Sequence, residues 1–116
     1  MNIHYYTRKF DLDQETKNYI EEKLKLVKKH FEQVIDVHVD LSTNDAHKKD
    51  EIYRVEINVH VPKQILRAVE RASNKWTAID EVINKLLREV RKYKTKIDNR
   101  NRHRRYLRKI GEFFGR

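Results

Sequence analysis

The stretch NKWTAIDEVINKLLREVRKYKTKI, residues 74–97, decides the fold because its apolar residues recur with the period of an α-helix. They follow one another at alternating steps of three and four residues, which places them on one face. Asn74 precedes the pattern and is a residue type that favours the N-cap position. The stretch therefore predicts a long helix that packs on a core. Its apolar face contains Trp76, Ile79, Ile83, Leu86, Val90, Tyr93 and Ile97.

A further helix is predicted upstream, from the N-cap candidate Asp13 to about Phe31. Its core-facing positions also recur at steps of three and four residues, so they form one buried stripe. The members of this stripe are Thr16, Ile20, Leu24, Val27 and Phe31.

Four stretches have the sequence character of β-strands, and they span residues 2–7, 34–42, 53–61 and about 65–71. The two central ones alternate apolar and polar side chains, as expected for strands with one face in the core and one in water. The polar residues 43–51 between them are predicted to form a surface loop. A turn at 62–64 joins the last two strands, although it lacks the Gly or Asn that tight turns favour.

The predicted order is β-α-β-β-β-α, an α+β domain over residues 1–97. An antiparallel four-stranded sheet with this alternation has one apolar face, and two helices packed on that face cover it. This build is related to that of double-stranded RNA-binding domains. The apolar pattern breaks after Ile97, so we expect residues 98–116 to form a basic, flexible C-terminal tail, within which residues 98–109 are disordered when free.

Positive charge is concentrated in the second half of the chain. The net charge is +9; residues 1–60 hold 10 Lys or Arg against 12 Asp or Glu, and residues 61–116 hold 17 against 6. Charge that serves solubility is usually mixed and scattered, so this concentration favours an anionic partner. Nucleic acid is the favoured partner, and an acidic protein, a membrane surface or an unemployed tail are the alternatives.

The composition also bounds the cellular setting. The chain has no cysteine, which excludes disulfides and thiolate metal sites. Its first ten residues contain no apolar signal-peptide core, and no apolar run reaches the roughly 18 residues that a membrane span needs. We therefore expect a soluble, cytoplasmic protein with no membrane partner.

The candidate nucleic-acid-binding residues are cations on the two predicted helices and just after them. Cations repeated every three to four residues along a helix can follow a phosphate backbone. Because both helices are predicted on one side of the sheet, we expect a basic groove between them. The candidates are Lys23, Lys25, Lys28, Lys29, Lys85, Arg88, Arg91, Lys92, Lys94, Lys96, Arg104 and Arg105.

Other kinds of site have little support. His38 and His60 are predicted on the wet face of neighbouring strands, but no HExxH-type spacing accompanies them, so we interpret them as exposed side chains and predict no metal or cofactor. The glycines are Gly111 and Gly115 alone, which excludes a glycine-rich phosphate loop. We predict that the protein is not an enzyme. A metal-dependent nuclease that uses the histidine face remains as a third possibility.

The helix stretch 74–96 resembles the second-helix signature of the ribosome hibernation-promoting factors and ribosome-associated inhibitors (protein Y). In that family an aromatic residue and a small-small-Ile-Asp/Asn stretch precede Lys-Leu-x-Arg-x-x-x-Lys. The segment EEKLKLV, 21–27, is similar to the first helix, and the strand order agrees, so the resemblance covers about residues 2–96. The matching positions are Trp76, Thr77, Ala78, Ile79, Asp80, Lys85, Leu86, Arg88 and Lys92.

This resemblance implies a short form of the family that binds the small ribosomal subunit, alone or in the intact ribosome, near the decoding centre. There it would compete with tRNA and mRNA and hold ribosomes inactive under stress or in stationary phase. Leu26 stands where relatives often have Lys, which shifts that contact to Lys25. A general structured-RNA binder or rRNA chaperone is the alternative. The resemblance places Lys23, Lys29, Lys85, Arg88 and Lys92 against rRNA, and matches Arg104 and Arg105 to an Arg pair of the tailed inhibitors.

Overall fold

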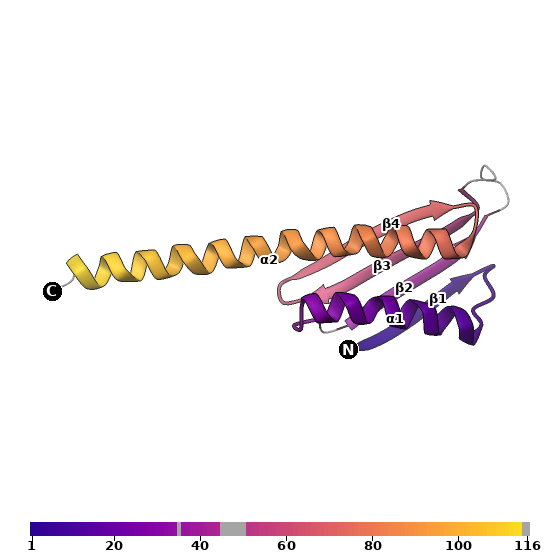
Figure 1. Cartoon of the computed structure of the whole chain (residues 1–116), viewed down its shortest axis with the longest axis horizontal. Coiled ribbons are helices and arrows are strands. Elements are labelled where there is room, and N and C mark those ends of the chain that lie inside the picture. Colours follow the sequence, from indigo (N-terminus) through magenta and orange to yellow (C-terminus); the bar gives the residue numbers. More distant parts are fainter. Residues whose placement is uncertain (35, 45–50, 115–116) are drawn as a thin grey trace.

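A computed structural model describes residues 1–34, 36–44 and 51–114 of the chain (Figure 1). Its elements follow the predicted order: β1 (Asn2–Arg8), α1 (Gln14–His30), β2 (Asp36–Thr43), β3 (Tyr53–Val61), β4 (Gln64–Ala72) and α2 (Lys75–Phe114). The predicted strand residue Ile35 and residues 45–50 of the predicted loop lie outside the described residues.

The four strands form one sheet in the order β1-β2-β3-β4. The β2–β3 and β3–β4 pairs are antiparallel, as predicted. In contrast, β1 runs parallel to β2, with Ile3 beside Val37, so the expectation of a wholly antiparallel sheet is wrong for this strand. The connection explains the difference: α1 carries the chain back along the sheet between β1 and β2, and both strands therefore run in the same direction.

The core lies between the sheet and the two helices, which pack on the same face (Figure 1). Alternate residues of the central strands, such as Val39 and Ile57, are fully buried against them. Full burial of a side chain of this size contributes roughly 1.5–3 kcal/mol. The predicted apolar face of α2 is confirmed at its centre, and its outermost members Trp76 and Ile97 are half-buried. Buried residues of α2 are Ala78, Ile79, Val82, Ile83, Leu86, Val90 and Tyr93.

Both predicted N-caps are present. The Asp13 carboxylate accepts a hydrogen bond from the backbone N–H of Thr16 at 2.8 Å, and bonds from the hydroxyl and N–H of Thr16 hold the pKa of Asp13 below its usual value. Asn74 Oδ1 accepts from the backbone N–H of Thr77 at 2.8 Å. Each side chain thereby satisfies a donor that a helix leaves unpaired in its first turn.

The β3–β4 hairpin closes through a tight turn at Pro62 and Lys63, with Val61 paired to Gln64. Lys63 adopts a left-handed conformation with φ of 66°, the position at which Gly or Asn is usually found. The chain thus makes the predicted turn without the expected residue type, at some backbone cost. The turn brings a lysine next to the underside of α2.

The second helix extends well beyond the predicted limit at Ile97. It continues to Phe114, and it projects past the sheet as a single helix (Figure 1). The structure thus describes residues 98–114 as helix, while the domain boundary near 97 and the flexibility of the tail when free stay predictions. The segment contains no Pro, and Arg, Lys and Leu are good helix formers, so local propensity favours continuation where no core packing does.

Asp80, a match to the family signature, links the two helices. Its carboxylate accepts a hydrogen bond from the hydroxyl of Tyr19 on α1. This bond, together with burial, raises the pKa of Tyr19. The Tyr19 ring also packs edge-on against Trp76, with ring centroids 5.0 Å apart. Three side chains therefore fix the start of α2 against α1.

We expect the Tyr19–Asp80 bond to appear as a coupling in a double-mutant cycle. Tyr19→Phe and Asp80→Ala should each lower the free energy of unfolding, and the double variant should lose about 1 kcal/mol less than the sum, because one hydrogen bond can be lost only once. Urea unfolding followed by Trp76 fluorescence measures this. Glu81→Ala, an exposed acid one position along the helix, is the control. Strictly additive losses would contradict the assigned role.

Candidate nucleic-acid interface

The predicted cations lie on the exposed sides of the helices, and together they are called the basic surface below. Lys23 and Lys85 are half-buried, and the other ten side chains are exposed. Among the described residues, Lys85 and Lys92 are the members with an acidic partner. The remaining ten charges are thus available to an external anion. The basic surface comprises Lys23, Lys25, Lys28, Lys29, Lys85, Arg88, Arg91, Lys92, Lys94, Lys96, Arg104 and Arg105.

The α1 cations of this surface lie on the second half of the helix. Lys23 Nζ lies 5.4 Å from the centroid of the Tyr19 ring, a cation–π contact that holds it against the helix. Lys28 and Lys29 occupy the last turn, where cations favourably oppose the negative end of the helix dipole. This contact with the helix dipole leaves the charges of Lys28 and Lys29 available to an external anion. Leu26, which lies between Lys25 and Lys28 in the sequence, is exposed.

Lys85, the first α2 cation of the predicted groove, does not lie between the two helices. Lys85 Nζ lies 3.7 Å from Glu70 Oε1 and 3.4 Å from the carbonyl oxygen of Val69, both on β4, the edge strand far from β1. Arg88 and Lys92 follow at helical spacing on this same β4 flank. Lys85 is therefore placed away from α1 and is partly neutralised.

A different pair of α2 cations lies on the side that faces α1. Arg91 and Lys94 follow Asp80 by 11 and 14 residues, which is close to three and four full turns of an α-helix. Because Asp80 contacts Tyr19 of α1, this side of α2 is directed toward α1. The basic surface consequently has two flanks, one along β4 and one toward the end of α1.

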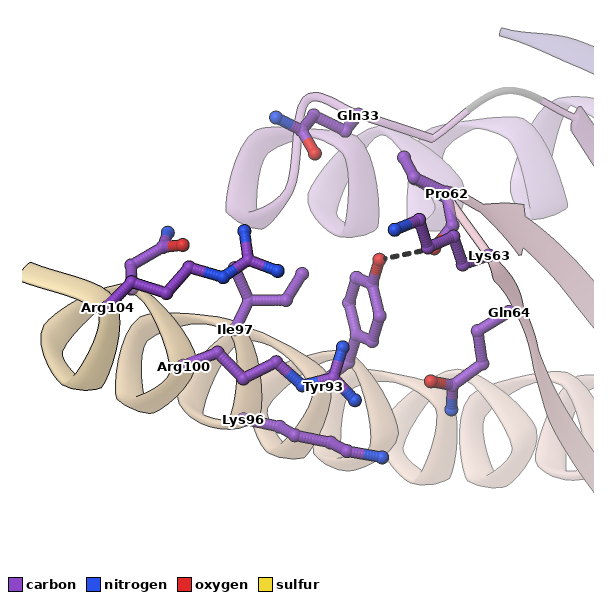
Figure 2. Close-up of a pocket in the computed structure, with 10 residues that line it drawn as sticks. Gln33, Pro62, Lys63, Gln64, Tyr93, Lys96, Ile97, Arg100 and Arg104 are labelled. Carbon is purple, nitrogen blue, oxygen red and sulfur yellow. Dashed lines mark hydrogen bonds between the residues drawn. The ribbon is translucent and has the colours of Figure 1, made fainter. Parts of the chain in front are cut away.

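A basic hollow of about 430 Å³ lies under α2, where the helix leaves the sheet (Figure 2). Tyr93 forms its inner wall, and its hydroxyl donates to the carbonyl oxygen of Pro62 at 2.8 Å. None of the described residues that line it is acidic, so a bound anion would meet positive charge from the hairpin turn and from α2. The cations of the basic hollow are Lys63, Lys96, Arg100 and Arg104.

Sequence reasoning missed Lys63 and Arg100 as candidate site residues. They are 37 positions apart, and the hairpin turn brings Lys63 beneath the helix only in the folded chain. Arg100 had a signal in the sequence, because residues 98–109 hold six Lys or Arg against one acid, whereas Lys63 had none. Arg104 lines the basic hollow, whereas Arg105, one helical step round, is exposed and donates through Nε to the carbonyl of Asn101 at 3.4 Å. The two arginines of the predicted pair therefore lie on different sides of the helix, and only Arg104 lines the basic hollow.

Residues 98–114 of α2, called the arm below, extend the positive charge beyond the domain. Residues 98–109 are exposed throughout and hold six Lys or Arg against one acid, Asp98. Tyr106 and Leu107 are exposed as well. An unpacked helix with this charge can lie along a phosphate chain with little steric hindrance. No helix within the described part of the chain is long and apolar enough to cross a membrane.

Comparison with protein families gives a match over most of the chain. The model of one family, described as sigma 54 modulation protein / S30EA ribosomal protein, matches residues 3–98. The chain belongs to this family. The match covers β1 to the first part of α2 and ends where the arm begins.

Two curated proteins are similar to this chain over about three quarters of its length. The chain is 33% identical over 89 residues to the "Ribosome hibernation promotion factor" of Deinococcus radiodurans, covering 77% of this chain and 47% of that protein. It is 38% identical over 93 residues to the protein of that name in Staphylococcus aureus, covering 76% of this chain and 45% of that protein. The chain thus spans about half the length of the curated relatives it matches.

Two solved structures share the fold. The ribosomal subunit interface protein of Coxiella burnetii superposes with a TM-score of 0.73 at 21% identity, over 82% of this chain and 99% of that one. The N-terminal domain of Thermus thermophilus Protein Y gives a TM-score of 0.70 at 24% identity, over 80% and 99%. These similarities confirm the α+β architecture.

We expect the arm to contribute little to the stability of the domain. A chain that ends at Asn99 should keep its melting temperature to within about 4 °C, because residues 100–109 are exposed and Tyr93 is the last buried side chain among those described for α2. Thermal unfolding by circular dichroism tests this, with the full chain as reference. A larger fall would show that the arm packs on the domain.

Proposed function

We propose that this protein binds the small ribosomal subunit near the decoding centre and, by occupying the sites of tRNA and mRNA, holds ribosomes inactive under stress or in stationary phase. Membership of the S30EA family and the names of the two hibernation-promoting relatives support this function. The observation that carries it for this chain is the basic surface, ten of whose twelve cations are without an acidic partner in the described residues.

Binding in this proposal is electrostatic and requires no catalysis. Lys and Arg that neutralise rRNA phosphates release condensed counterions, and this release supplies much of the affinity. The two flanks are directed at different segments of RNA. The β4 flank contains Arg88 and Lys92, and the other flank contains Arg91 and Lys94. A folded domain that is bound to RNA along both flanks excludes tRNA and mRNA by occupying the space that they need. The proposal places this action in the cytoplasm.

The basic hollow supplies a more localised contact. Arg100 and Arg104 can each donate two parallel hydrogen bonds to a phosphate, and Lys63 and Lys96 add charge. We assign the hollow to one rRNA phosphate group. The arm then continues along the same RNA chain.

Charge reversal on the β4 flank should abolish binding without harming the fold. Arg88→Glu with Lys92→Glu changes the charge by four units at exposed positions opposite the apolar face, so the melting temperature should be kept while ribosome affinity falls by at least tenfold. Co-sedimentation with isolated small subunits measures this.

The matched control for this variant is Arg8→Glu with Lys9→Glu. It makes the same change in net charge at exposed residues at the end of β1, outside the basic surface. Equal losses in the two variants would mean that net charge, and not the basic surface, determines binding. Normal binding by the α2 variant would remove this flank from the interface.

Salt should weaken binding steeply. If about six or more phosphates are contacted, raising the salt from roughly 50 to 200 mM should reduce affinity by about three orders of magnitude or more. Truncation at Asn99 should reduce the slope of log affinity against log salt, because the arm's contacts are lost. A slope unchanged by truncation would show that the arm makes no phosphate contacts.

Competition with tRNA separates this function from general RNA binding. Purified protein is sedimented with small subunits and with intact ribosomes, with and without bound tRNA. The proposed function requires near-stoichiometric binding that tRNA excludes. Binding that ignores tRNA, and that any structured duplex RNA matches, would favour the rRNA chaperone alternative.

A further inference from the structure

The outer face of the sheet, opposite the helices, carries a cluster of histidines and one acid. In the parallel β1–β2 pair His4 lies beside His38, and Asn2 lies beside Asp36. In the neighbouring pair, His60 lies opposite Asp36, while Asn58 lies opposite His38. The predicted face-to-face pair of His38 and His60 is thus a diagonal one, with ring centroids 4.8 Å apart.

Three of these side chains converge. The Nε2 atom of His4 is 3.7 Å from Oδ1 of Asp36, and the rings of His4 and His38 stack with centroids 4.6 Å apart. One ligand atom each from His4, Asp36 and His38 lies within 4.8 Å of both others. Donor atoms at this separation need only small side-chain rotations to meet at one ion.

The surroundings orient His38 for this role. The hydroxyl of Tyr6 hydrogen-bonds with Nδ1 of His38 at 3.2 Å, and among the described residues Nε2 of this ring has no hydrogen-bond partner. Histidines that bind metals usually engage their second ring nitrogen in such a bond, which fixes the ring. Tyr6 is therefore a positioning residue for the cluster.

The charge pattern on this face also leaves Asp36 available. The two nearby arginines, Arg54 and Arg67, both pair with Glu56. Within the described residues, Asp36 has His4 as its ion-pair partner and no lysine or arginine. Its carboxylate is thus not already neutralised by a permanent cation.

We propose that His4, Asp36 and His38 bind a divalent first-row transition metal, with zinc the best match. Two imidazoles and one carboxylate are a common zinc ligand set, and water completes the tetrahedron. His60 lies next to His38 and is the nearest further imidazole. The ion would link the edge strand β1 to β2 on the face that the basic surface does not use.

Metal binding to the full-length, chelator-treated chain tests the proposal. Isothermal titration with Zn²⁺ should give one site of micromolar affinity, and Co²⁺ should give the visible absorption of a tetrahedral complex. His4→Ala, Asp36→Asn and His38→Ala should each weaken binding at least tenfold and abolish any rise in melting temperature with Zn²⁺. Unchanged affinity in the His38→Ala variant would overturn the proposal.

The matched controls are His30→Ala and His103→Ala, which remove exposed histidines located on α1 and in the arm. Both should bind Zn²⁺ like the unaltered chain, and a loss in either would mean that the metal binds elsewhere. His60→Ala reports whether this ring is a fourth ligand: a tenfold loss would add it, and no loss would confirm the three-residue site.

A second measurement avoids dependence on variants that fold. Paramagnetic Co²⁺ added to the unaltered chain should broaden amide resonances first around residues 4–6 and 36–40. Broadening centred on the N-terminal amine or on the arm would contradict the assigned site.

Discussion

The burial of one face of α2 on β3 and β4 is the constraint on which the rest of the structure depends. Because the apolar residues occupy one face of the helix, charged residues can lie only on the rest of its circumference. Core packing therefore determines the direction of each cation. Leu86 and Val90 are buried, and Lys85, Arg88 and Lys92 are consequently turned to the β4 flank. At the end of the packed region, the bond from Tyr93 to Pro62 ties the helix to the hairpin turn and so forms the wall of the basic hollow. The binding surface is thus a consequence of core packing.

Most of the fold could be predicted because alternation and helical periodicity are local signals. Both N-caps, Asp13 and Asn74, and the order of the six elements were visible in the sequence. The direction of β1 was not, because an alternating strand looks the same in a parallel and an antiparallel pair. The basic hollow was also not visible, since Lys63 and Arg100 meet only through tertiary structure. Sequence spacing gave the list of cations, but not the two flanks on which they lie.

The two parts of α2 are helical for different reasons. Up to Tyr93 the helix is stabilised by burial, whereas the arm is stabilised by local propensity and by the helical turns that precede it. The break in apolar periodicity after Ile97 coincides with the start of the exposed residues 98–109, but the helix continues beyond it. The closely spaced positive charges of the arm repel one another, and an aligned polyanion would relieve that repulsion. The helix of the arm is therefore expected to gain more from RNA than the helix of the domain.

The two faces of the sheet are suited to separate ligands. The helix-covered face presents long, flexible cations that can follow a phosphate chain, while the outer face presents short imidazoles held in place by stacking and by Tyr6. A metal ion on the outer face would constrain β1, whose Tyr5 hydroxyl donates to Glu21 on α1. Burial and this bond raise the pKa of the Tyr5 hydroxyl above its usual value. Tyr5 thereby joins β1, the strand that carries His4, to the helix that carries Lys23, Lys25, Lys28 and Lys29. The proposed metal site and the cations of α1 therefore lie on elements that a hydrogen bond connects.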